Sequence, residues 1–199
     1  MIWQSYYWKK ELLKIADKLD KRINQKKWFE ASNANAEKDI MISAFMIRRL
    51  YESNKIDKEM FNKTIKICQY KSNGKKINLL KRLSPDNYFD MNKPIFSNLT
   101  IKDICNNIIH SYIFILIFND KGFNSFWVAS DYNKFKFMLE IEMKIYLPIL
   151  MKVGNFYPKS EIYEYDEKLE DYKIVYNPKK LLHYIHIPSS DINNKVKRK

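Results

Sequence analysis

Hydrophobic residues recur with helical spacing over two long segments near the N-terminus. The first segment covers residues 2–24 and the second covers residues 35–53. In each, apolar side chains follow one another three or four residues apart, while lysines and carboxylates fill most of the intervening positions. This pattern predicts two amphipathic helices, each of which buries one face.

Alternation of apolar and polar residues, together with a continuous apolar run at residues 113–118, predicts strands in the rest of the chain. Residues 63–70 alternate and are rich in β-branched side chains, so they predict one strand. Three further segments are separated by turn-forming residues and predict an antiparallel meander: 113–118, 123–129 and 134–142. A closing helix is expected over residues 143–153, and Gly154 follows it.

These elements together favour an α+β fold. We expect an N-terminal helical bundle, a three-stranded antiparallel meander, and a C-terminal helix followed by an extension. The chain has 199 residues, of which 46% are hydrophobic, and this suffices for one domain with a substantial core. We place that domain at residues 1–158 and a partly ordered extension with a basic tail at residues 159–199.

The formal net charge of +13 favours an anionic partner such as RNA. The net charge is weaker evidence for such a partner than it would otherwise be, because lysine, asparagine and isoleucine are abundant throughout the chain and this general composition supplies much of the charge. Arginine, which grips phosphate with a planar fork, is scarce by comparison. Two of the few arginines, Arg48 and Arg49, are adjacent on the second predicted helix. They would either pair with nearby carboxylates or present a cation to a phosphate.

Several classes of protein are excluded by what the sequence lacks. No run of about 18 apolar residues is present, so we expect no membrane partner. The N-terminal residues do not have the pattern of a signal peptide, and a cytoplasmic location is expected. Three glycines are too few for a phosphate-cradling loop, so we expect no cofactor. His183 and His186 lack a third nearby ligand, so no metal site is predicted.

The segment from Thr100 to Tyr112 carries the strongest candidate chemistry. Its apolar residues have the spacing of a core-facing helix. Lys102, Asn106 and His110 are four residues apart, which places them on a more polar face of that helix. His110 is one of only three histidines, and it would either stabilise the helix end or act on a ligand as a proton carrier.

Asn106 and His110, followed by Ser111 and Tyr112, resemble the signature helix of the HEPN superfamily. Its members are small, usually dimeric helical bundles of toxin–antitoxin pairs, phage defence and RNA processing. The ribonuclease members carry Arg-Asn-x-x-x-His, in which arginine holds the scissile phosphate and histidine supports acid–base catalysis. Tyr112 matches a tyrosine that, in some toxins, is nucleotidylated by the antitoxin. The longer stretch from Asn87 to Phe118 also resembles a group of uncharacterised bacterial proteins, a likeness that implies no activity.

Cys105 occupies the position of the motif arginine, and a thiol cannot grip a phosphate as a guanidinium does. The resemblance therefore implies a homodimer that binds RNA, or a protein such as an antitoxin, without cleaving RNA. Lys102, Arg48 or Arg49 could supply the missing cation. In that alternative, the protein is a metal-independent endoribonuclease that uses Asn106 and His110. A third alternative is a structural or adaptor module.

Overall fold

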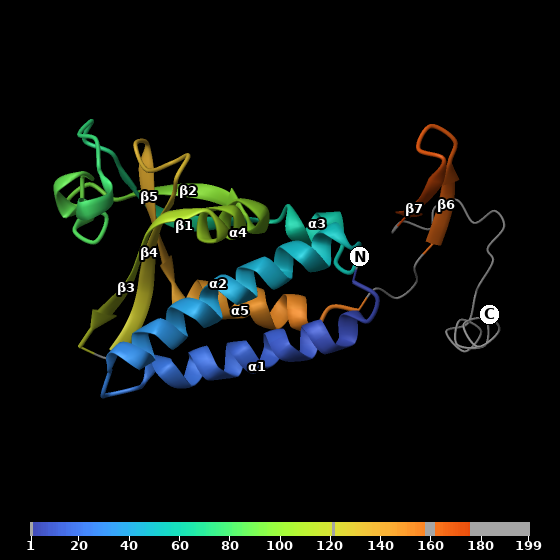
Figure 1. Cartoon of the computed structure of the whole chain (residues 1–199), viewed down its shortest axis with the longest axis horizontal. Coiled ribbons are helices and arrows are strands. Elements are labelled where there is room, and N and C mark those ends of the chain that lie inside the picture. The colour runs from blue at the N-terminus through green and yellow to red at the C-terminus, as the bar shows by residue number, and fades with distance from the viewer. Residues whose placement is uncertain (1, 121, 158–161, 176–199) are drawn as a thin grey trace. The chain divides into compact units, whose positions relative to one another are not determined.

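Five antiparallel strands form one sheet in the order β2-β1-β5-β4-β3 (Figure 1). In this computed structural model, residues 2–120, 122–157 and 162–175 are described. The strands are β1 (Thr64–Lys71), β2 (Ile95–Thr100), β3 (Ser111–Asn119), β4 (Gly122–Ser130) and β5 (Phe137–Glu142). Strand β1 pairs with β2 on one side and with β5 on the other, where Cys68 lies opposite Glu140.

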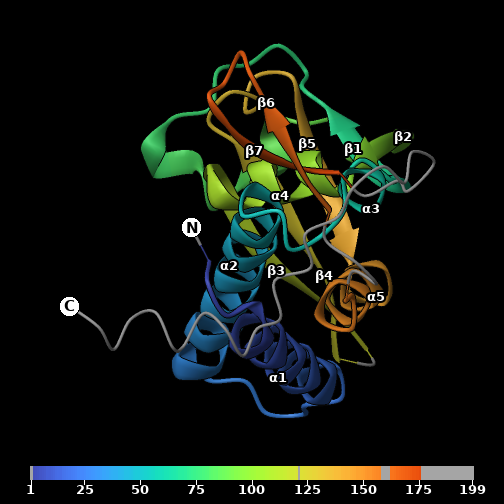
Figure 2. The same cartoon turned by 90° about the vertical axis from the view of Figure 1, so that its right-hand side faces the viewer.

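Four helices cover one face of this sheet (Figure 2). They are α1 (Ser5–Ile23), α2 (Glu30–Glu52), α4 (Ile101–Ile109) and α5 (Met143–Gly154). Leu12, Ile47 and Ile104 from three of the helices are completely buried in the same core as Phe126 and Leu139 of the sheet. A short helix, α3 (Lys58–Phe61), connects α2 to β1 and buries Met60 and Phe61.

The other face of the sheet is covered in part by the segment between β1 and β2. This segment contains two short 3₁₀ helices, Leu79–Lys81 and Pro85–Asn87. Ile77 and Phe89 from this segment are buried against Ile113, Ala129 and Met138 of the sheet. The sheet therefore separates a large helix-covered core from a smaller one.

Helix α4 is short because both of its ends are fixed by local contacts. At its start, Thr100 and Asp103 form a capping box in which each side chain accepts a hydrogen bond from the other residue's backbone N–H. Near its end, the Asn107 side chain donates to the Asp103 carbonyl and accepts from Asn133 Nδ2. The helix ends at Ile109, and strand β3 begins at Ser111.

The chain divides into two compact units, residues 1–157 and 158–199. In the second unit, β6 (Ile162–Asp166) and β7 (Asp171–Val175) form an antiparallel hairpin. The predicted basic tail and the two histidines at 183 and 186 lie outside the described residues. No helix in the described ranges is long and apolar enough to cross a membrane.

The prediction of an N-terminal HEPN-like bundle with a separate three-stranded meander is wrong. The meander segments do form strands, but β1 pairs with β5 and joins them to β2 in a five-stranded sheet. The helices contact one another, α1 with α5 and α2 with α4, but their buried residues share one core with the sheet. The reason is that the buried residues of α1 and α2 share a core with strands distant in sequence, and the spacing of apolar residues on a helix does not show which elements complete that core.

The predicted helix over residues 100–112 is also too long. Ser111 and Tyr112 belong to β3, so Tyr112 is not on the same helix as Asn106 and His110. Residues 95–100, of which only Thr100 was assigned to a predicted element, form β2. The four-residue helix α3 was not predicted, because it is too short to show a helical period.

We predict that Tyr146→Phe lowers the free energy of unfolding by about 1–2 kcal/mol. The Tyr146 hydroxyl is completely buried between α5 and α2, 2.8 Å from Ser43 Oγ, and it donates to the Ile40 carbonyl at 3.1 Å. Phenylalanine keeps the ring contacts and loses these bonds. Urea unfolding of the two proteins gives the difference. Tyr6→Phe is the control, since Tyr6 is 52% exposed. Equal stability of Tyr146→Phe and the unchanged protein would contradict the prediction.

Candidate functional site

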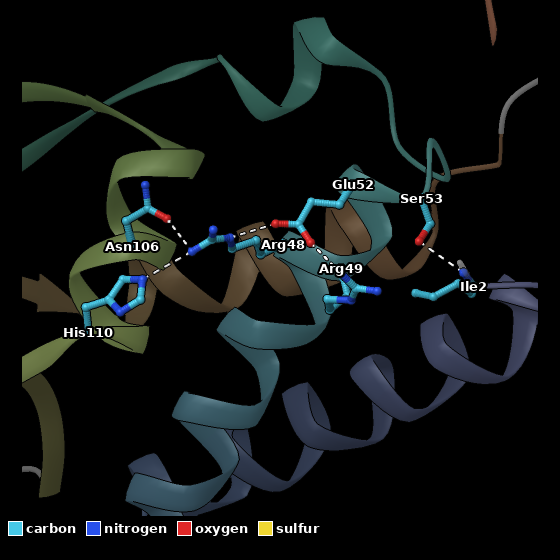
Figure 3. A network of polar contacts seen from close by, with 7 residues as sticks. All are labelled: Ile2, Arg48, Arg49, Glu52, Ser53, Asn106 and His110. Carbon is cyan, nitrogen blue, oxygen red and sulfur yellow. Dashed lines mark hydrogen bonds and ion pairs between the residues drawn. The ribbon is translucent and has the colours of Figure 1, made fainter. Parts of the chain in front are cut away.

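Arg48 connects helix α2 to the predicted site residues on α4 (Figure 3). Its Nη1 atom donates to Asn106 Oδ1 at 3.2 Å and lies 3.2 Å from Nε2 of His110. Asn106 and His110 lie one helical turn apart, so both side chains reach the same guanidinium nitrogen. The structure therefore brings together three of the predicted site residues. We call Arg48, Asn106 and His110 the arginine cluster.

The orientation of Arg48 is fixed from its other side by Glu52. The Nε atom of Arg48 donates to Glu52 Oε1 at 2.9 Å, and Nη1 of Arg49 donates to Glu52 Oε2 at 2.7 Å. The hydrogen bond from Arg48 lowers the pKa of Glu52, and Arg49 adds to this effect. Glu52 is therefore a carboxylate at neutral pH, and it holds two arginines in place.

The guanidinium of Arg48 retains one open edge. A guanidinium has five N–H donors, and Arg48 uses three of them for Glu52, Asn106 and His110. Among the described residues, none accepts a hydrogen bond from its Nη2 group. The Arg48 side chain is 37% exposed, so this edge is open to a ligand. An arginine held by three partners has already lost most of its rotamer freedom. Binding an anion to it therefore costs less side-chain entropy than binding the anion to a freely moving arginine.

The contact with Arg48 determines which nitrogen of His110 carries the proton. Arginine only donates hydrogen bonds, so Nε2 must be the acceptor. In this arrangement the ring proton is on Nδ1. Its Nε2 lone pair is occupied by Arg48 and is not available to remove a proton from a substrate.

Two backbone contacts hold the exposed His110 side chain at the end of α4. The His110 N–H donates to the Asn106 carbonyl at 3.1 Å, and the His110 carbonyl accepts from the N–H of Asp131 at 3.0 Å. The neighbouring Asn107 is buried and is bonded within α4 and to the turn after β4. The cluster therefore lies on a fixed helix end rather than on a free loop.

Cys105 faces away from the arginine cluster and into the protein core. Its side chain is 1% exposed, and burial raises the pKa of the thiol to about 12. It packs where the apolar spacing of α4 predicts a core residue. The structure therefore provides a guanidinium from α2, and not from position 105, next to Asn106 and His110.

Three other predicted binding residues lie apart from the cluster. Arg49 bonds to Glu52 and has no contact with Asn106 or His110 in the described structure. Lys102 is exposed one turn before Asn106, with no hydrogen bond to another described residue. Tyr112 belongs to β3 and packs with the smaller core, where Nζ of Lys134 lies 4.0 Å from its ring centre.

Glu52 is the member of this network that the sequence interpretation missed. It lies four residues after Arg48 on the same helix, a spacing at which a carboxylate and an arginine form an ion pair. That spacing is visible in the sequence and could have identified it. No group of three or more metal-ligating side chains is found within the described residues.

Comparisons with protein-family models, with curated proteins and with solved structures found no match. The resemblance of residues 105–112 to the HEPN signature therefore stays a prediction.

We predict that neutral His110 is protonated at Nδ1 and that this preference depends on Arg48. Imidazole ¹⁵N–¹H correlation spectra report which nitrogen carries the proton, and a His110→Ala variant assigns the signals. Arg48→Met removes the donor to Nε2 and should shift the proton towards Nε2. Arg49→Met leaves the Arg48 donor in place and should not shift the ring proton. A ring protonated at Nε2 in the unchanged protein would contradict the geometry.

A second prediction concerns the buried thiol. With a pKa of about 12, Cys105 stays protonated at about pH 8 and at about pH 9.5, and thiols react with iodoacetamide only as thiolates. We expect no labelling of Cys105 in the folded protein at either pH, and complete labelling in urea. A Cys68→Ala variant isolates the signal in mass spectrometry. Labelling of Cys105 in the folded protein would show that α4 opens.

Proposed function

We propose that this protein binds RNA by holding a backbone phosphate at the arginine cluster, and that it does not cleave the RNA. The observation that carries the proposal is the placement of Arg48 Nη1 at 3.2 Å from both Asn106 Oδ1 and His110 Nε2. Arginine, histidine and an amide are residue types that contact phosphate and sugar in nucleic-acid complexes.

The charge of the chain supports an anionic ligand. Its net charge is +13, and its three glycines exclude the glycine-rich loops that bind mononucleotides through backbone N–H groups. Side chains are the remaining phosphate donors that this site offers, and the exposed edge of Arg48 is a donor pair with the geometry for it.

The hydrogen bonds of the cluster support the proposed absence of cleavage. Metal-independent cleavage of RNA needs a base for the 2′-hydroxyl and an acid for the leaving oxygen. The Nε2 lone pair of His110 is occupied by Arg48, and the lowered pKa of Glu52 keeps it from donating a proton. The described cluster therefore has a phosphate-binding cation without a free acid–base pair.

Arg48→Met is expected to weaken RNA binding by about tenfold or more, the effect of losing a charged hydrogen bond of about 1.5–3 kcal/mol. Fluorescence anisotropy with labelled RNA of mixed sequence at about 50 mM salt measures the affinity. The matched control is Arg49→Met, which removes the same charge from the adjacent position. Arg49→Met should weaken RNA binding by only about two- to threefold, because Arg49 lies outside the arginine cluster.

Equal losses for the two variants would contradict a specific role for the cluster and leave only a general effect of charge. The same mixtures, run on a denaturing gel, test cleavage. RNA cutting that disappears in His110→Ala would contradict the proposal in favour of a metal-independent endoribonuclease. A thermal melt of each variant separates loss of binding from loss of folding.

A further inference from the structure

Helix α2 exposes an aromatic ring one turn before Arg48. Phe45 is 48% exposed and Ile42, three residues earlier, is 42% exposed, although α2 buries Ala44 and Ile47 completely. Residues three apart on a helix are neighbours, with Cβ atoms about 5–6 Å apart. Phe45 therefore lies one helical turn before Arg48 and Arg49 on the surface of α2.

A cation precedes this apolar pair on the same side of the helix. Lys38 is exposed and lies four residues before Ile42, and Arg48 lies three residues after Phe45. These four residues cover about 15 Å along the axis of α2. We call them the α2 stripe. An apolar surface with a cation at each end suits a ligand with negative charges along its length and flat apolar groups between them.

Unpaired nucleotides have this chemistry. Each carries a phosphate and a base, and a base stacks on an aromatic ring only when its face is not covered by duplex stacking. We propose that Phe45 is a base-stacking platform, that a phosphate of the same strand binds Arg48, and that the ligand is single-stranded RNA. This inference rests on the proposed function, to which it adds the class of RNA.

A protein partner is the competing occupant of an exposed apolar pair. The charges at the two ends of the α2 stripe favour the nucleic acid, since a polyanion pairs with both cations. Among the described residues, no acidic side chain forms an ion pair with Lys38.

The test compares Phe45→Ala with Phe29→Ala. Phe29 is the N-cap of α2 and is 67% exposed, about 24 Å from Phe45 along the helix, so both changes remove an exposed ring from one element. Affinities are measured by anisotropy for a labelled single strand of about 12 nucleotides and for its duplex.

Phe45→Ala should weaken single-strand binding by about 5- to 100-fold, the range found when a stacking ring is lost. Duplex binding should change by less than about twofold, since a duplex offers no base face to the ring. Phe45→Tyr should bind the single strand like the unchanged protein, and Phe29→Ala should do so as well.

Four outcomes would overturn the inference. If Phe45→Ala binds the single strand normally while Arg48→Met does not, Phe45 is not a base-stacking platform and the proposed function remains. If Phe45→Ala weakens both RNAs equally, the ring acts by positioning Arg48. If light scattering shows that Phe45→Ala changes the mass of the particle, the ring is a protein contact. No RNA binding by the unchanged protein would overturn the function and the inference together.

Discussion

The pairing of β1 with β5 is the constraint on which the arrangement of this protein depends. It joins residues about seventy positions apart, with Cys68 opposite Glu140, and it places the β1–β2 hairpin at the edge of the meander. Helix α4 connects β2 at one edge of the sheet to β3 at the other. Because of this connection it crosses the sheet next to α2, and Asn106 and His110 come within reach of Arg48.

The arginine cluster illustrates how a site can form from a helix that lacks one of its expected residues. Position 105 points into the core, where a guanidinium would have to be buried at a large cost in free energy. Arg48 reaches Asn106 and His110 from the adjacent helix, at a position where its head group stays partly hydrated. The positive charge of the Arg48 guanidinium therefore lies at the edge of the core and is not buried in it.

Local patterns in the sequence were sufficient for most of the helices and strands. The helical spacing of α1, α2 and α5, the alternation in β1 and β5, and the apolar run of β3 followed by a turn and β4 are all visible in the sequence. Strand β2 was missed because Ser97 and Asn98 interrupt its apolar alternation, and its pairing with β1 compensates for this in the fold. The prediction of a helical bundle failed because it concerned how the elements pack. The apolar face of a helix does not show whether a helix or a sheet covers it.

For the candidate site, too, the sequence predicted the helix positions of the residues but not the packing that brings them together. The spacing of Asn106 and His110 placed them on one face of a helix, and the adjacent arginines were singled out as a second source of charge. The sequence could not distinguish Arg48 from Arg49, because they differ only in which way each side chain leaves α2. Only the packing of α4 against α2 separates them.

Glu52 has a consequence for how firmly any anion is held. Its carboxylate is bonded to both arginines, so it neutralises part of their charge before a ligand arrives. An incoming phosphate meets an internal counterion that stays in place, and its Coulomb attraction is reduced accordingly. Such a site gains selectivity for geometry at the expense of strength.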